Sequence, residues 1–191
     1  MDRLVVALSG ASGQIIGIRL LEVLRQRRVV ETHLVITEAA RVTIAQETDW
    51  QLADIERLAD AVYSPGDIGA AIASGSFATR GMVVVPCSIK TLSAIAHSYN
   101  AELIARAADV QLKQGRPVVL VVRETPLHRG HLRLMLEATE NGCVIMPPVP
   151  AFYYRPATIE DLVNHTVGRI LARLGIDNAL YREWTGPAGE D

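Results

Sequence analysis

The sequence predicts a single α/β domain, in which helices cover both faces of a doubly wound, mostly parallel sheet as a Rossmann- or flavodoxin-like three-layer sandwich. Short apolar runs rich in β-branched residues alternate with longer helical patterns, which is typical of repeated βαβ units. The runs are apolar at nearly every position, as in parallel strands buried on both faces. A chain of 191 residues has room for one such domain.

The predicted elements alternate along the chain. The apolar runs predict strands over residues 4–8, 33–37, 81–86, 117–122 and 143–146. The helical patterns cover residues 15–25, 38–47, 89–97, 103–113, 132–139 and 159–174. We expect residues 1–176 to form the domain and residues 177–191 to form a partly mobile C-terminal tail at the surface.

Two segments interrupt this alternation. Residues 64–80 are rich in turn-forming residues and lie between elements, where ligand-binding loops are common. Residues 147–156 contain four prolines around a group of aromatic residues. Because proline fixes φ and breaks strand ladders, we expect an ordered arm there that reaches a pocket or a neighbouring subunit.

Composition excludes several classes of protein. Hydrophobic residues make up 49% of the chain and charged residues 21%, a balance that argues against disorder. The net charge of −2 predicts no nucleic-acid partner, and any anion must meet a local cluster. Only Lys90 and Lys113 are lysines, so anion sites would mostly use arginine. Two cysteines, no signal peptide and no apolar run of membrane-spanning length predict a cytoplasmic protein without a membrane partner.

The first candidate site is the turn at residues 9–13, between the first strand and the first helix. This topology places backbone N–H groups and a helix N-terminus against a phosphate. The spacing of Gly10, Gly13 and Gly17 does not fit the dinucleotide fingerprint, and no lysine follows as in a P-loop, so a mononucleotide is favoured. A tight turn with Ser12 as the helix N-cap is an equally good interpretation.

A second strand end opens into a helix at residues 86–91, with Ser88 as a candidate N-cap. Two such turns near a topological switch point could hold a cofactor between them. Lys90 in the first helical turn opposes the helix dipole and indicates an anion. Cys87 has no histidine near it in the sequence and is interpreted as a packing residue.

Other charged residues allow two interpretations each. Arg106 and Lys113 lie on one stripe of a helix, and such a charged stripe usually faces solvent. Arg123 and Glu124 follow a strand at the edge of the sheet where ligands bind, but the two side chains could also form only an ion pair. From its position alone, Glu47 is an ordinary surface carboxylate. His128 and His131 have a metal-ligand spacing, but no third ligand lies nearby, so no metal site is expected.

Six blocks of sequence occur in the order found in the UbiX-like flavin prenyltransferases, which this chain closely resembles from about residue 4 to residue 176. The blocks are residues 9–13, 47–48, 86–92, 106–113, 123–128, and 150–153 with 160–163. The resemblance implies a flavin-binding α/β domain. It also implies transfer of a dimethylallyl group from dimethylallyl phosphate to N5 and C6 of reduced FMN, with no metal. The prenylated FMN product would pass to a UbiD-like decarboxylase. Members of the family assemble as dodecamers whose active sites lie where subunits meet.

The resemblance also implies roles for particular residues. Ser12 and Glu47 would take part in proton transfer at flavin N5. FMN would be held by Gly10, Ala11, Ser12, Thr37, Ser88, Ile89, Lys90, Thr91 and Arg123. The prenyl phosphate would be surrounded by Arg106, Lys113, Glu124, Tyr153 and Arg169.

Four residues depart from the family pattern. Thr37 stands where many relatives have serine, Ile68 stands where some have tryptophan, and Tyr154 with Arg155 replaces a pair that contains His or Asn. Two alternative functions stay open. A flavin-dependent cysteine decarboxylase would share the fold but usually carries a histidine near the flavin and an asparagine-containing loop, neither of which we find here. A non-catalytic FMN carrier subunit of a decarboxylase is the second alternative.

Overall fold

The computed structural model describes residues 1–186 and contains one six-stranded sheet with the order β3-β2-β1-β4-β5-β6. All neighbouring strands pair in parallel. The strands are β1 Asp2–Leu8, β2 Val30–Ile36, β3 Ala61–Tyr63, β4 Gly81–Cys87, β5 Val118–Val122 and β6 Cys143–Ile145. The chain builds the sheet outward from β1 to β3 and then returns to place β4 on the other side of β1. The topological switch point therefore lies between β1 and β4.

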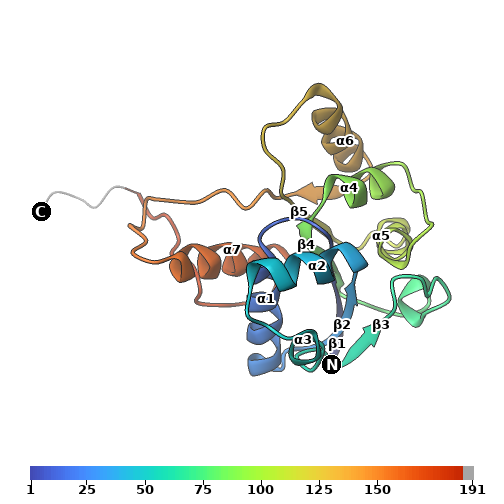
Figure 1. Ribbon diagram of the computed structural model, residues 1–191, viewed down its shortest axis with the longest axis horizontal. Helices are drawn as coiled ribbons and strands as arrows, with labels where there is room; N and C mark the ends of the chain where they lie inside the picture. Colours follow the sequence, from blue (N-terminus) through green and yellow to red (C-terminus); the bar gives the residue numbers. More distant parts are fainter. Residues whose placement is uncertain (187–191) are drawn as a thin grey trace, which may run out of the picture.

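Helices cover both faces of this sheet, which confirms the predicted three-layer fold (Figure 1). The helices are α1 Gln14–Arg27, α2 Glu38–Glu47, α3 Leu52–Glu56, α4 Ile89–Ala96, α5 Leu103–Lys113, α6 Arg129–Glu140 and α7 Ile159–Arg173, with a short 3₁₀ turn at Ala71–Ala73. The sequence pattern predicts neither α3 nor β3. Both are short, and the β3 strand lies at the edge of the sheet with Val62 exposed, so neither has a continuous apolar pattern.

The sheet separates two hydrophobic cores. In β1, Leu4, Val6 and Leu8 pack with α1 and α7, whereas Val5 and Ala7 pack with α4 and α5 on the other face. Successive side chains of a strand point to opposite faces, so a strand covered on both faces is apolar throughout. This explains why the strand segments contain no polar alternation.

The α1 helix packs tightly against β4. A Cβ atom on Gly17 would come within 2.4 Å of the Val85 carbonyl oxygen, so only glycine allows this approach. The contact positions the N-terminus of α1 beside the carboxyl end of β4.

Beyond β6, the chain extends from the body of the molecule as the predicted arm and returns through α7 (Figure 1). The segment after α7 packs back on that helix, where the Asn178 side-chain amide donates a 3.0 Å hydrogen bond to the Gly168 carbonyl. The last part of the predicted tail, residues 187–191, lies outside the described residues. None of the helices within residues 1–186 combines the length and the apolar character that crossing a membrane requires.

Candidate active site

The turns after β1 and β4 are hydrogen-bonded to each other at the switch point. The buried Ser9 hydroxyl donates to the Pro86 carbonyl at 3.0 Å and accepts from the Ser88 N–H at 2.8 Å. The Ser9 N–H also donates to the Pro86 carbonyl at 3.2 Å. The two predicted ligand-binding turns therefore form one unit.

The first turn is held from within by Gln14, whose side chain is fully buried. Its Nε2 donates to the carbonyls of Ser9 at 2.8 Å and Ala11 at 2.9 Å. The N-cap of α1 is Gly13 with φ of 96°, which means that the interpretation of Ser12 as the N-cap is wrong. The Ser12 side chain is thus not used to cap the helix.

Glu47, at the end of α2, caps α1 instead. Its carboxylate accepts hydrogen bonds from the N–H groups of Gly13 at 2.9 Å and Gln14 at 3.2 Å. A carboxylate at this position satisfies free N–H groups and faces the positive end of the helix dipole. The interpretation of Glu47 as an ordinary surface carboxylate is therefore wrong.

The pKa of Glu47 reflects this environment. Burial by itself raises the pKa of the carboxyl group. Hydrogen bonding from the Ser12 side chain and from the two backbone N–H groups opposes that effect, and so does the positive charge of Arg123. The net result is a pKa below the ordinary glutamate value, so Glu47 is ionised at neutral pH.

A cavity of about 120 Å³ opens beside these turns, and three hydroxyl-bearing side chains contribute to its lining. The Thr37 hydroxyl caps α2 by accepting from the Ala40 N–H at 3.1 Å, and the Ser88 hydroxyl caps α4 by accepting from the Thr91 N–H at 3.2 Å. The cavity is lined by Gly10, Thr37, Glu38, Ala39, Pro65, Ser88, Lys90, Thr91 and Glu102. The loops meet closely here, since a Cβ atom on Gly10 would lie 2.4 Å from the Ala39 Cβ.

This donor set fits the phosphate and ribityl part of FMN. The first turn of α4 contains no acidic residue, so its N-terminus and the Ser88 and Thr91 hydroxyls can face an anion. The N-terminus of α1 differs, because Glu47 already occupies its first N–H groups. The cavity is smaller than typical ligand pockets of roughly 300 Å³ or more, so the rest of the flavin would extend along the edge of the sheet.

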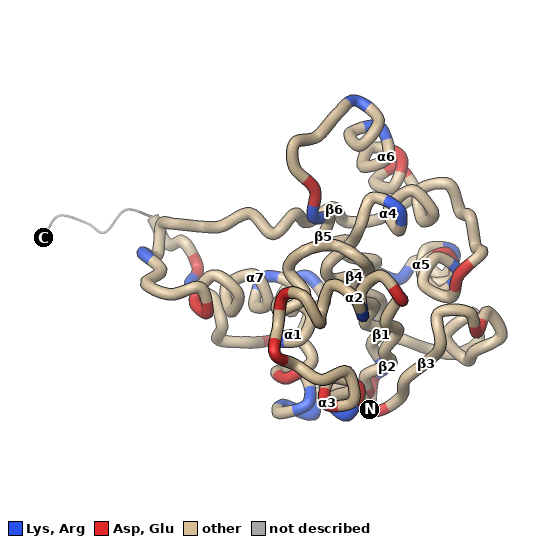
Figure 2. The backbone as a smooth tube through the Cα atoms, in the orientation of Figure 1, with Lys and Arg blue, Asp and Glu red and all other residues tan. Residues whose placement is uncertain are grey.

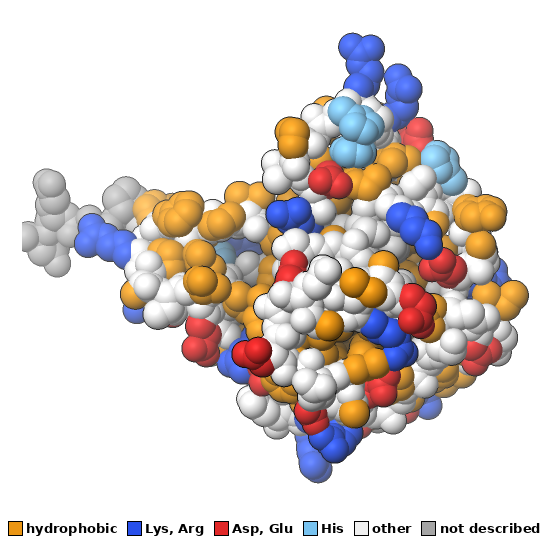
Figure 3. Space-filling model, in the orientation of Figure 1, with side chains coloured by type: hydrophobic (Ala, Val, Ile, Leu, Met, Phe, Trp, Pro, Cys, Tyr) orange, Lys and Arg blue, Asp and Glu red, His pale blue; other side chains and the backbone are white. Residues whose placement is uncertain are grey.

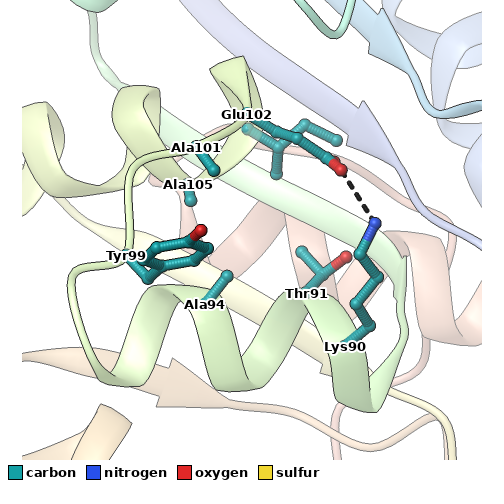
Figure 4. A pocket seen from close by; sticks show the side chains of 8 residues that line it. Lys90, Thr91, Ala94, Tyr99, Ala101, Glu102 and Ala105 are labelled. Atoms are coloured by element: carbon teal, nitrogen blue, oxygen red, sulfur yellow. Dashed lines mark hydrogen bonds and ion pairs between the residues drawn. The ribbon is translucent and has the colours of Figure 1, made fainter.

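Lys90 lies at this cavity, but its ammonium group has a partner within the chain. It contacts the Glu102 carboxylate at 2.8 Å, between the starts of α4 and α5 (Figure 4). Beside this ion pair, Tyr99 and small residues of both helices enclose a second cavity of about 50 Å³ (Figure 4). An anion at the α4 N-terminus would compete with Glu102 for Lys90.

Arg123 and Glu124 follow β5 at the carboxyl edge of the sheet, as predicted. The Arg123 N–H donates to the Cys87 carbonyl at 3.1 Å, which ties the end of β5 to the end of β4. Both side chains are exposed, and Arg123 is near enough to Glu47 to lower the pKa of that carboxyl group. The structure thus brings together Ser12, Glu47 and Arg123, which are far apart in sequence.

The prenyl-phosphate residues predicted on α5 lie on one face of the sheet. Arg106 contacts Asp109 at 3.2 Å, one turn further along the helix. Lys113 is the last residue of α5, shortly before β5 begins at Val118, and so lies toward the amino ends of the strands. Within one chain, Lys113 therefore lies away from the flavin-binding turns.

Tyr153 and Arg169 lie on the other face, because α7 packs in the core opposite that of α5. They line an open cavity of about 510 Å³ together with Tyr181 and Trp184 from the segment after α7. One chain therefore assembles the residues predicted to hold FMN and move protons, but it does not bring the five predicted prenyl-phosphate residues together.

Charged residues are dispersed over the rest of the molecule. Lysine, arginine and acidic residues occur mostly on the helices and loops (Figure 2). The strands contain Asp2, Arg3 and Glu31, near the starts of β1 and β2. On the face shown in Figure 3, basic, acidic and hydrophobic side chains are interspersed rather than gathered by sign. This face shows no continuous basic stripe.

Sequence reasoning missed several residues around the site. Ser9 and Gln14 lie in or beside the turn at residues 9–13, yet nothing in their spacing indicates that their side chains join the turns. Tyr181 and Trp184 were placed in the tail, although the aromatic residues themselves were a signal of packing. For the histidine pair, the ring centroids of His128 and His131 are 3.6 Å apart and the ring planes are tilted by 34°. The described residues include no group of three or more potential metal ligands.

Comparisons with known proteins place the chain in a family of flavin-binding enzymes. The Flavoprotein family matches residues 1–171. Flavin prenyltransferase UbiX from Escherichia coli (strain K12) is 57% identical over 188 residues, which cover 97% of this chain and 100% of the relative. The enzyme of the same name from Thauera aromatica is 56% identical, with 96% of this chain and 94% of the relative covered.

Solved structures show the same architecture. AnUbiX (PadA1), in complex with FMN and dimethylallyl pyrophosphate, matches with a TM-score of 0.94 and 49% identity over 97% of this chain and 98% of that one. A dodecameric FMN-dependent UbiX-like decarboxylase from Escherichia coli O157:H7 matches with a TM-score of 0.94 and 46% identity, covering 96% and 100% of the two chains. The cysteine decarboxylase TvaF, at 16% identity and a TM-score of 0.66, covers 92% and 99% of the two chains and shares the fold alone.

The fold and the site define a flavin-binding α/β protein, and the chain belongs to the Flavoprotein family, among its UbiX-like flavin prenyltransferases.

Proposed function

We propose that this protein transfers a dimethylallyl group from dimethylallyl phosphate to N5 and C6 of reduced FMN. Family membership over nearly the whole chain supports the reaction class. The observation that carries the proposal is the meeting of Ser12, Glu47 and Arg123 beside the turns suited to FMN. FMN is here the acceptor of the prenyl group, and the reduced ring supplies the two nucleophilic atoms.

The flavin would lie along the carboxyl edge of the sheet. Ser88, Ile89, Lys90 and Thr91 would hold its phosphate end at the N-terminus of α4, and Thr37 would contribute a second hydroxyl. Gly10, Ala11 and Ser12 would pass close to the ring, and Arg123 would lie at its edge. The hydrogen bonds of Ser9 and Gln14 keep these turns in place before the flavin arrives.

Ser12 and Glu47 would manage protons. Bond formation at N5 releases the N5 proton as the phosphate leaves, and bond formation at C6 releases the C6 proton while the allyl double bond takes up one proton. Because the pKa of Glu47 is lowered, its carboxylate is available to accept a proton at neutral pH, with Ser12 between it and the flavin. Its hydrogen bonds to α1 fix the direction from which it acts.

Arg106, Lys113, Glu124, Tyr153 and Arg169 would bind the prenyl phosphate. Breaking the allylic C–O bond requires that charge on the departing phosphate be stabilised, which cationic groups and a phenol donor can do. Exclusion of water prevents capture of the allyl group as dimethylallyl alcohol.

This phosphate site would be completed by neighbouring copies of the chain, as a homo-oligomer and, by analogy with the UbiX-like structure, a dodecamer. The α5 and α7 residues lie on opposite faces of one sheet, so copies must supply them to each other. Leu132 and Leu136 of α6 and Val149, Phe152 and Ile159 near the arm are exposed apolar residues that subunit contacts would bury. The product, prenylated FMN, would pass to a UbiD-like decarboxylase in the cytoplasm.

One anaerobic assay tests the reaction. The purified protein is incubated with reduced FMN and either dimethylallyl phosphate or dimethylallyl diphosphate, and the flavin is analysed by mass spectrometry. We expect a flavin heavier by one prenyl group with the monophosphate. Unchanged flavin with both donors would instead favour the FMN carrier. Loss of CO₂ from a peptidyl cysteine substrate would favour the cysteine decarboxylase.

A further inference from the structure

The Tyr153 hydroxyl makes two hydrogen bonds in the region between the arm, α7 and the segment that follows α7. It donates to the Arg182 carbonyl oxygen at 2.6 Å. It also lies 3.0 Å from Nε2 of His165, a buried side chain of α7. Tyr153 itself is 41% exposed, so its ring extends from this buried partner toward solvent.

The proton count at this hydroxyl assigns a direction to both hydrogen bonds. A phenol has one proton to donate and lone pairs that accept. Since the proton points to the Arg182 carbonyl, the hydrogen bond with His165 must be donated by Nε2–H of the imidazole. In the other tautomer, Nε2 would accept the phenol proton and no donor would remain for another ligand.

Aromatic packing holds the His165 ring in this position. Tyr154 stacks on it with ring centres 4.7 Å apart and an angle of 5° between planes. Tyr181 meets its edge at 6.1 Å and also lies 5.8 Å from the guanidinium carbon of Arg169. His165 and Arg169 are four residues apart and share one face of α7.

The protonation state of His165 agrees with this arrangement. Burial, and to a smaller extent the charge of Arg169, lowers the pKa of the imidazole. The ring is therefore neutral at pH 7 and has a single N–H to donate. A hydrogen bond accepted by the phenol oxygen also makes the phenol a stronger donor, because hydrogen bonds in a chain polarise one another.

We propose that His165 is a positioning residue for the prenyl donor: its Nε2–H occupies a lone pair of the Tyr153 hydroxyl, so that the phenol proton remains the one this hydroxyl donates. That proton is donated to the Arg182 carbonyl in this structure, and a bound phosphate oxygen would replace the carbonyl as its acceptor. This inference rests on the proposed function of Tyr153 in phosphate binding and adds a residue that does not itself touch the substrate.

A double-mutant cycle on the assembled, FMN-containing protein tests the proposal. His165→Leu should raise KM for dimethylallyl phosphate about tenfold, the effect of losing one hydrogen bond of ordinary strength, with a smaller change in kcat. His165→Gln, which keeps an N–H donor, should recover most of the loss. In a Tyr153→Phe background, His165→Leu should change KM by less than about twofold, because the hydroxyl through which it acts is absent.

Tyr154→Phe is the matched control, since its hydroxyl donates to the Asp161 carbonyl at 3.2 Å and the stacked ring is kept. Its KM should match wild type, and FMN affinity should be unchanged in all variants. An unchanged KM in His165→Leu, or an equal rise in the Tyr153→Phe background, would overturn the proposal.

The same double-mutant cycle can be measured without turnover, as the affinity of each variant for inorganic phosphate in a calorimetric titration. If the wild-type protein failed to prenylate FMN, the proposed function would fall, while coupling between His165 and Tyr153 in phosphate affinity would still decide the positioning role. No coupling in that titration would reject it.

Discussion

The Ser88 N–H donates a 2.8 Å hydrogen bond to the Ser9 hydroxyl across the switch point of the sheet, although the two residues are 79 positions apart. Ser9 also donates to the Pro86 carbonyl, so one buried hydroxyl satisfies groups of both turns. The shape of the flavin-binding edge therefore depends on a side chain that need not touch the ligand.

Ser9→Ala should destabilise the protein and weaken FMN binding. The substitution leaves the Ser88 N–H without its partner in a buried region, a loss of roughly 1–3 kcal/mol. Thermal unfolding and FMN titration measure the two effects. Ser76→Ala, at an exposed loop position, is the control and should stay within about 0.5 kcal/mol of wild type. Wild-type FMN affinity in Ser9→Ala would show that the turns are held by other contacts.

Glu47→Gln should slow formation of prenylated FMN by roughly a hundredfold or more while FMN stays bound, because a proton acceptor contributes about 10²–10⁴ in rate. The amide oxygen can still accept from the Gly13 and Gln14 N–H groups, so the turn should keep its shape. Single-turnover mass spectrometry and FMN titration separate the two effects. Glu140→Gln, exposed on α6, serves as the control. A wild-type rate would refute the proposed proton role.

The same carboxylate makes stability depend on pH. Its pKa in the folded protein is lower than in the unfolded chain, so its contribution is present above the ordinary glutamate pKa. That contribution is lost as pH falls through the lowered, folded-state value. The difference in melting temperature between wild type and Glu47→Gln should therefore shrink between pH 6 and the acid range. A constant difference over that range would argue against the capping role.

Arg169→Ala should chiefly weaken binding of dimethylallyl phosphate. A charge-assisted hydrogen bond is worth about 1.5–3 kcal/mol, which corresponds to roughly a 10- to 100-fold rise in KM. FMN affinity should not change, because α7 is separate from the flavin-binding turns. Steady-state kinetics measure the effect, with Arg133→Ala on α6 as the exposed control. Turnover of Arg169→Ala at wild-type KM would remove Arg169 from the phosphate site.

The sheet could be predicted because burial on both faces makes the long strands apolar at nearly every position. All four residues of β1 from Leu4 to Ala7 are apolar and fully buried, and the helices between strands repeat the βαβ order. The edge strand β3 has no such apolar pattern, because it is short, pairs with a strand on one side only and exposes Val62.

The site was less accessible to sequence reasoning, because its contacts join distant positions. The carboxylate of Glu47 meets Gly13 across 34 positions, and neither residue's neighbours indicate the other. Likewise, the aromatic residues at 181 and 184 contribute to a cavity only because the segment after α7 folds back on that helix. The resemblance to a family supplied the residue roles, which local patterns left open.

Because α5 and α7 lie on opposite sides of the sheet, substitutions on these two helices should impair different halves of the phosphate site. A chain altered at Lys113 and a chain altered at Arg169 each retain the half that the other lacks. When the two impaired variants are unfolded, mixed and reassembled, a fraction of the subunit interfaces should combine two intact halves and bind dimethylallyl phosphate with the wild-type KM. Either variant reassembled alone should keep its raised KM, so recovery in the mixture would show that the two halves of the site come from different subunits.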